Sequence, residues 1–167
     1  MERDDILKKV EEACELFSEG KIDDAALRSV LTDIPDEVWQ EDSSVEIIKI
    51  LIENEYLYNL SFENHENFSK FICGFIPKSF WNNSDNVAYL TAVIAEFFGQ
   101  NFYSVNCEDI SSILNNSPAS HWQDNNFCCS IVEIVMKYEN IFEDLACISD
   151  LFPDSFFDNE YNLKSVV

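Results

Sequence analysis

The sequence predicts an all-α protein built as a stack of helical repeats in a single domain, and three observations support this prediction. A proline followed four residues later by an aromatic residue recurs with its proline at positions 35, 77, 118 and 153, which gives spacings of 42, 41 and 35 residues. Such spacings are typical of helical solenoids. Apolar residues between these prolines recur at helical spacing. The 167 residues include three Gly and four Pro, and so few helix-breaking residues suit a helical chain.

Each proline–aromatic pair, called a corner below, is expected to start a helical turn. Proline has a φ angle preset near the helical value and lacks the N–H that a first turn leaves unpaired. The aromatic residue lies one turn further along the same face. We expect the indoles to be core wedges between repeats, with exposed anchors for a partner as the alternative. The four pairs are Pro35 and Trp39, Pro77 and Trp81, Pro118 and Trp122, and Pro153 and Phe157.

Residues 1–33 are predicted to form an N-terminal cap of two helices. Apolar residues at helical spacing indicate the first helix over residues 2–19, and Gly20 is expected to end it. Asp23 and Asp24 then precede a second apolar segment, where carboxylates meet the positive end of a helix.

The first repeat is predicted to hold two helices. Ser43 and Glu46 form a capping-box pattern before a strongly apolar segment that ends near Asn54. This segment is rich in β-branched residues, so periodicity alone leaves a strand open, but the interleaved charges and the repeat context favour a helix. The second helix is expected from Glu66 to Cys73.

The later repeats follow the same plan. A long helix is predicted from Asn86 to Phe98, ending at Gly99, and a shorter helix from Glu108. In the next repeat the second helix is expected to start at Glu143, after a shorter loop. The predicted boundaries are residues 34–75, 76–116 and 117–151 for three repeats and residues 152–167 for a C-terminal partial repeat.

The corner at residues 76–81, which reads Ile-Pro-Lys-Ser-Phe-Trp, is followed by a polar cluster and an apolar helix. This pattern resembles short bacterial helical repeats of unknown function, which read roughly Pro-x-x-Phe-Trp, polar turn, apolar helix. The resemblance covers about residues 34–157, and the third corner departs from it with Ser117 and His121 in place of apolar residues. It implies a stack of α-helices and no activity.

The net charge is the unusual feature of the composition. Ten Lys and Arg against 32 Asp and Glu give −22 at pH 7. Such a surface repels nucleic acid and anionic membranes and attracts basic proteins, although the charge serving only solubility is the alternative. In its size, acidity and lack of catalytic motifs the chain also resembles immunity proteins of bacterial toxin systems, a likeness that carries no residue motif.

The cysteines indicate a reducing cytoplasm. They include no C-x-x-C pair, and the two histidines, His65 and His121, are far apart in the sequence, so zinc-site spacing is absent. Several cysteines lie among apolar residues, as buried thiols do. The acidic N-terminus lacks a signal-peptide core, and no apolar run reaches membrane-spanning length. The six cysteines are Cys14, Cys73, Cys107, Cys128, Cys129 and Cys147.

No pattern in the sequence indicates catalysis. The three glycines form no phosphate-binding loop, and no Ser, Cys or calcium-loop motif is present. We therefore expect a non-enzymatic protein without metal or cofactor.

The expected binding surface is acidic. One regularity is an acidic residue ten or eleven positions before each proline, at Asp24, Glu66, Glu108 and Glu143, which caps a helix, contributes to an acidic ridge, or does both. The candidate partner-binding residues are Asp36, Glu37, Glu41, Asp42, Glu66, Glu108 and Asp109.

The leading hypothesis is an immunity protein whose carboxylates cover the basic cleft of a toxin, with a nuclease as the expected target. One alternative is a phage-encoded acidic inhibitor, such as an anti-CRISPR protein or nucleic-acid mimic. Another is a helical-repeat adaptor whose groove binds a peptide.

Overall fold

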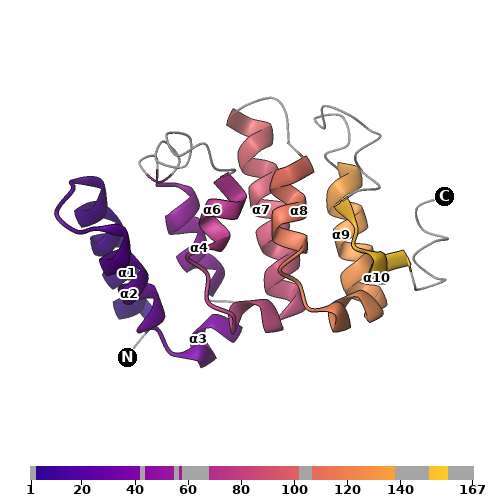
Figure 1. The fold of residues 1–167 in the computed structure, drawn as a ribbon, viewed down its shortest axis with the longest axis horizontal. Helices are drawn as coiled ribbons and strands as arrows, with labels where there is room; N and C mark the ends of the chain where they lie inside the picture. The colour runs from indigo at the N-terminus through magenta and orange to yellow at the C-terminus, as the bar shows by residue number, and fades with distance from the viewer. Residues whose placement is uncertain are drawn as a thin grey trace. The chain divides into compact units, whose positions relative to one another are not determined.

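The computed structural model describes residues 3–41, 44–54, 57, 68–101, 107–137 and 151–157. Every regular element in these ranges is an α-helix or a 3-10 helix, and none of the described residues forms a strand (Figure 1). The all-α prediction is therefore confirmed.

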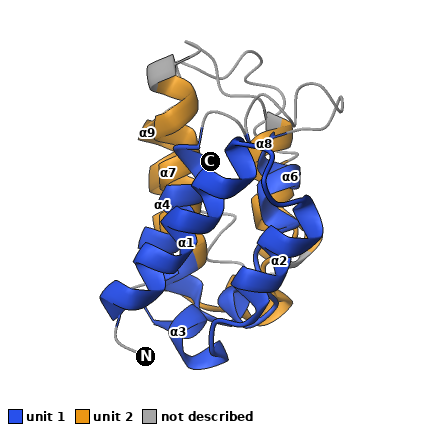
Figure 2. Ribbon diagram, turned by 90° about the vertical axis from the view of Figure 1, so that its left-hand side faces the viewer, with its two compact units in different colours: residues 1–86 blue, residues 87–167 orange. Residues whose placement is uncertain are grey.

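The chain forms two compact units, residues 1–86 (unit 1) and residues 87–167 (unit 2) (Figure 2). The boundary falls inside the long helix α7 (Ser84–Asn101), whose first three residues belong to unit 1.

Unit 1 begins with α1 (Arg3–Ser18), an amphipathic helix with a buried apolar face. The chain leaves it at Gly20, whose φ of +68° lies in the left-handed region that favours glycine. The Gly20 N–H donates to the Phe17 carbonyl at 3.0 Å, and the Lys21 N–H donates to the Leu16 carbonyl at 2.9 Å. These bonds satisfy carbonyls of the last turn and confirm the predicted helix end.

The second helix, α2 (Asp24–Thr32), packs against α1 (Figure 1). Asp23 caps it, because its Oδ1 accepts a hydrogen bond from the Ala26 N–H at 2.9 Å. The predicted start of this helix at the acidic pair is confirmed.

Arg28 ties α2 to the turn that follows α6 (Phe68–Cys73). Its guanidinium forms an ion pair with Asp24 at 2.8 Å, donates to the Gly74 carbonyl and lies 4.2 Å from the centre of the Phe75 ring. One cation thus links two segments that are more than forty residues apart in the sequence.

The β-branched segment of the predicted first repeat is the helix α4 (Ser44–Ile52), so the strand alternative is excluded. It packs against α1 and against the short helix α3 (Asp36–Gln40). Ser43 lies outside the described residues, so the capping box stays a prediction. The core-facing residues of this helix are Val45, Ile47, Ile48, Leu51 and Ile52.

Each of the four corners has the same kind of backbone hydrogen bond, which runs from the N–H three residues after the proline to the proline carbonyl. Pro35 and Pro118 have ψ angles of 142° and 143°, so each is the capping residue before the helical turn. Proline was expected inside the first turn; it precedes that turn because the extended ψ lets its carbonyl accept the first hydrogen bond. The N–H groups that donate to the proline carbonyls are those of Val38 to Pro35 at 3.0 Å, Phe80 to Pro77 at 3.2 Å, His121 to Pro118 at 3.0 Å and Phe156 to Pro153 at 2.8 Å.

The indoles are core residues. Trp39, Trp81 and Trp122 are 0%, 6% and 1% exposed, in agreement with the expected core wedges. The fourth corner differs, because Phe157 is half-buried and the preceding Phe156 is fully buried. In that corner the core aromatic is therefore three residues after the proline.

Consecutive corners interlock through aromatic rings in the same way in both units. In unit 1, the Trp39 ring meets Phe80 edge to face at 6.4 Å and 82°. In unit 2, the Trp122 ring meets Phe156 at 5.8 Å and 85°. In each case the indole of one corner contacts the aromatic residue three positions after the next proline, which is a favourable ring geometry.

The structure corrects one helix end. The long helix was expected to stop at Gly99, but α7 continues to Asn101. Glycine weakens a helix interior by roughly 0.5–1 kcal/mol and does not forbid one, so a glycine is a stop only where the chain also turns away.

The other elements follow the predicted order. The 3-10 helix η1 (Phe80–Asn82) forms the second corner, and α8 (Cys107–Leu114) follows α7. In unit 2, η2 (Ala119–Gln123) packs against α9 (Asn125–Lys137) and α10 (Asp154–Phe157). The expected helix starts at Glu66 and Glu143 lie outside the described residues.

Candidate partner-binding surface

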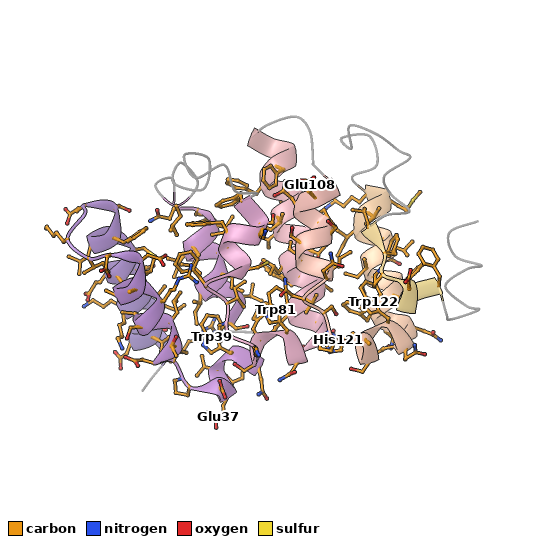
Figure 3. The ribbon with its side chains drawn as sticks, in the orientation of Figure 1. Glu37, Trp39, Trp81, Glu108, His121 and Trp122 are labelled. Atoms are coloured by element: carbon orange, nitrogen blue, oxygen red, sulfur yellow. The ribbon has the colours of Figure 1, made fainter. Side chains whose placement is uncertain are left out.

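Three of the candidate residues lie at the surface of unit 1. Asp36 and Glu37 occupy the first turn of α3, and Glu41 follows its last turn; all three are exposed. Figure 3 shows Glu37 projecting away from the ribbon at α3. Asp42 and Glu66 lie outside the described residues, so their places in the surface stay predictions.

The two candidates on α8 point in different directions. Glu108 is exposed, and its carbonyl accepts hydrogen bonds from the hydroxyls of Ser111 and Ser112 at 3.2 and 2.6 Å. Asp109 is only 4% exposed, so the expectation that it belongs to an acidic surface is not met. It shares a helix face with the fully buried Ile113 four residues later, and one step along a helix turns a side chain by about 100°.

The acidic charge is spread over both units. Residues 1–86 hold 20 Asp and Glu against eight Lys and Arg, a net charge of −12, and residues 87–167 hold 12 against two, a net charge of −10. No Lys or Arg occurs between Lys78 and Lys137. Each unit by itself therefore attracts cations.

Ion pairs on α1, on α2 and in the turn between them use some of the cations of unit 1. Lys8 pairs with Glu12 at 3.7 Å, and Lys21 pairs with Glu19 at 2.7 Å. Asp24, the first member of the expected ridge, pairs with Arg28 within its own helix. Asp24 therefore fits the interpretation as a helix-start residue that interacts with the helix dipole better than the interpretation as part of an unpaired acidic ridge.

An open groove of about 480 Å³ lies between α1 and α4. Glu11 and Glu15 are four residues apart on α1, so their carboxylates share one helix face, and Glu19 continues that spacing. The groove was not predicted from the sequence, although the repeated spacing of four residues between these glutamates was a visible signal. The lining residues are Glu11, Cys14, Glu15, Ser18, Glu19, Ile50, Glu53 and Asn54.

Hydrogen bonds hold one end of the groove. The Ser18 hydroxyl donates to the Cys14 carbonyl at 2.8 Å, and the Asn54 side-chain amide donates to the Ser18 Oγ at 3.3 Å. The Asn54 Oδ1 also accepts from the Leu57 N–H at 3.0 Å. The bond between Asn54 and Ser18 links the end of α1 to the residues that follow α4.

The Cys14 thiol at the groove has low reactivity. It is 3% exposed, and burial, followed by the nearby charge of Glu11, raises the pKa of Cys14 to about 11. At neutral pH it is therefore a protonated, weakly polar group and a poor nucleophile.

His121 is a packed residue of the third corner. Its Nδ1 lies 3.1 Å from the Ser117 Oγ, and its ring meets Phe127 edge to face at 5.4 Å. This polar pair takes the positions that apolar residues hold in the second corner. Among the described residues, no cluster of three or more His, Cys, Asp or Glu is arranged to hold a metal ion.

Comparisons of the chain with protein-family models, with curated proteins and with solved structures returned no match. The class of the protein is defined by its helical fold, its charge and its prolines: it is an acidic, all-helical protein with four proline–aromatic corners. Within the part of the chain that the structure describes, no helix is both long and apolar enough to cross a bilayer.

Proposed function

We propose that this chain is a non-enzymatic, acidic binding protein that acts in the bacterial cytoplasm as an immunity protein. Its target is a basic toxin, for which a nuclease is the best candidate, and it covers the active cleft of that toxin. The observation that carries the proposal is the excess of carboxylates over cations in both units, with exposed acids such as Glu37 and Glu108.

Charge explains how such an inhibitor works. A nuclease cleft is positively charged because it must hold phosphates, so a surface of carboxylates competes with the nucleic acid for it. Complementary charge speeds association, with on-rates up to ~10⁸–10⁹ M⁻¹s⁻¹ at low salt. The buried indoles do not serve as anchors, and Leu16 and Met136 are exposed apolar side chains that can slow dissociation.

The finer architecture belongs to the same proposal. The shared backbone hydrogen bond of the four corners supports a helical solenoid of about three and a half repeats. The matching ring contacts of Trp39 and Trp122 support the same register. In such a stack each repeat contacts its neighbours and presents a long surface to a partner.

The test is inhibition of a purified basic partner. The protein is used to capture partners from its native host at low salt, and a captured nuclease is then titrated with it. We expect nuclease activity to disappear at one molar equivalent. A partner that is acidic, or a captured nuclease that stays active in excess inhibitor, contradicts the proposal.

Matched variants locate the surface. The variant Asp36→Asn, Glu37→Gln and Glu41→Gln removes three exposed carboxylates, and the control variant Asp4→Asn, Asp5→Asn and Asp33→Asn removes three others. We expect the first variant to slow association about tenfold and the control to change it less. Equal on-rates for both variants would remove α3 from the surface.

Salt separates the proposal from the adaptor hypothesis. Exposed charge pairs are screened at high ionic strength, so an immunity complex formed by charge associates more slowly as salt rises. Tight binding that persists at high salt would favour a peptide held in an apolar groove.

A further inference from the structure

The groove between α1 and α4 lies where two helices end. Its lining includes Ser18, the last residue of α1, and Ile50, in the last turn of α4. The C-terminal end of a helix carries a partial negative charge from its aligned peptide dipoles. The backbone therefore adds to the negative potential of the carboxylates in the groove.

Among the described residues, most carboxylates of the groove have no ion-pair partner. Glu19 pairs with Lys21 at 2.7 Å. In the ranges that the structure describes, Glu11, Glu15 and Glu53 have no ion-pair partner. Three like charges thus line one groove, which is unfavourable for the free protein and favourable for binding a cation.

Beside the carboxylates and the polar side chains of Ser18 and Asn54, the lining has an apolar or weakly polar part formed by Cys14 and Ile50. Cys14 is more than nine-tenths buried, and within the described part of the chain its Sγ has no hydrogen-bond partner. Ile50 is half-buried on the opposite wall. Among the described residues no cluster of carboxylates is arranged to hold a metal ion, whereas a side chain with a methylene stem and a charged end can contact both the apolar and the acidic part of the lining.

We infer that this groove receives a lysine or arginine side chain of the basic partner. The methylene stem lies against Ile50 and Cys14. The charged end lies among the carboxylates of Glu11, Glu15 and Glu53. This inference rests on the proposed function, because the side chain belongs to the basic protein proposed above.

The test uses a blocked hexalysine peptide as the probe and isothermal titration calorimetry as the readout. The groove variant is Glu11→Gln, Glu15→Gln and Glu53→Gln. The control is the variant Asp4→Asn, Asp5→Asn and Asp33→Asn, which changes the net charge equally and includes residues at the other end of the same helix. Circular dichroism verifies that both variants fold.

We expect the groove variant to bind hexalysine about tenfold more weakly and the control less than twofold more weakly. Equal losses in the two variants would show a general charge effect and overturn the inference.

A second probe tests the stem without changing the protein. Blocked hexaornithine has the same charge as hexalysine and one methylene fewer in each side chain. Burial of one methylene is worth up to about fourfold in affinity, so we expect weaker binding of hexaornithine. Equal affinity for the two peptides would overturn the assignment of Ile50 and Cys14 to the stem.

The inference and the proposed function fail separately. If the groove variant still inhibits the captured nuclease and binds hexalysine as the control does, the groove assignment is wrong and the proposed function stands. If the groove variant alone loses hexalysine while the captured partner is acidic, the groove is supported and the proposed function is wrong.

Discussion

At the scale of single residues, the corners depend on a few buried rings. Trp39 is fully buried, its Nε1–H donates to the Leu31 carbonyl at 3.3 Å, and its ring meets Phe80. One side chain thus joins α2, α3 and η1 within unit 1. A large buried ring contributes far more to the free energy of unfolding than an exposed apolar side chain of similar size does.

We therefore expect Trp39→Ala to lower the free energy of unfolding by about 3–5 kcal/mol, because it leaves a cavity in the core. The measurement is denaturant unfolding followed by circular dichroism. Leu16→Ala, at a side chain that is exposed, is the control and should cost less than about 1 kcal/mol. Equal losses would mean that the indole is not a core residue.

Cys14 makes stability depend on pH in the alkaline range. Its pKa is raised from 9.0 to about 11 in the folded state by burial and then by Glu11. Above pH 9 the unfolded state loses the thiol proton while the folded state keeps it, so the unfolded state binds fewer protons and stability falls as pH rises. The stability from this group is complete below pH 9 and is lost as pH rises to about 11.

We expect the wild-type protein to lose about 1–3 kcal/mol more than Cys14→Val between pH 8 and pH 11, which chemical denaturation at each pH measures. Other groups that titrate in this range are common to both proteins and cancel in the difference. Parallel pH profiles for the two proteins would mean that the thiol is not shielded from water.

At the scale of elements, asparagines fasten the start of α7 to the end of α3. The Asn86 side-chain amide donates to the carbonyls of Trp39 at 3.1 Å and Glu41 at 3.4 Å, and Asn86 is almost fully buried. Asn83 donates to the Gln40 carbonyl at 2.7 Å and accepts from the Asp85 N–H, which caps α7. Both contacts lie within unit 1 and hold one corner against the next.

We expect Asn86→Ala to destabilise unit 1 by about 1–3 kcal/mol, because it leaves a buried carbonyl without a donor. Hydrogen exchange should show the loss as weaker protection of the α3 and α4 amides. The control, Asp85→Ala, removes an exposed side chain from the same turn and should leave those amides protected. Unchanged exchange in Asn86→Ala would assign the junction to ring packing alone.

At the scale of the whole molecule, the net charge of −22 works against the compact state. Like charges repel one another over distances that added salt shortens, because the Debye length falls from about 30 Å at 0.01 M to about 10 Å at 0.1 M ionic strength. The same charge that attracts a basic partner therefore has a cost in stability.

We expect the melting temperature to rise by several degrees between low salt and roughly 0.5 M sodium chloride, as the Debye length shortens further. The rise should be smaller in the control variant Asp4→Asn, Asp5→Asn and Asp33→Asn, which carries three fewer negative charges. A melting temperature that stays constant or falls with salt would mean that self-repulsion is not a significant term.

The residue pattern alone determined the helical class, the proline corners, the end of α1 and the start of α2. These features depend on neighbours in the sequence: periodic apolar residues, the capping carboxylate of Asp23 and the positive φ of Gly20. The sequence also predicted exposed acids such as Glu37, because charged side chains lie mostly at the surface.

Tertiary structure decided which acids reach solvent and where they meet. Asp109 is buried and Glu108 is exposed because packing selects one face of α8. The helix α7 continues past Gly99 to Asn101. The groove unites α1 with α4, segments about 35 residues apart, and only packing between distant segments brings such carboxylates together.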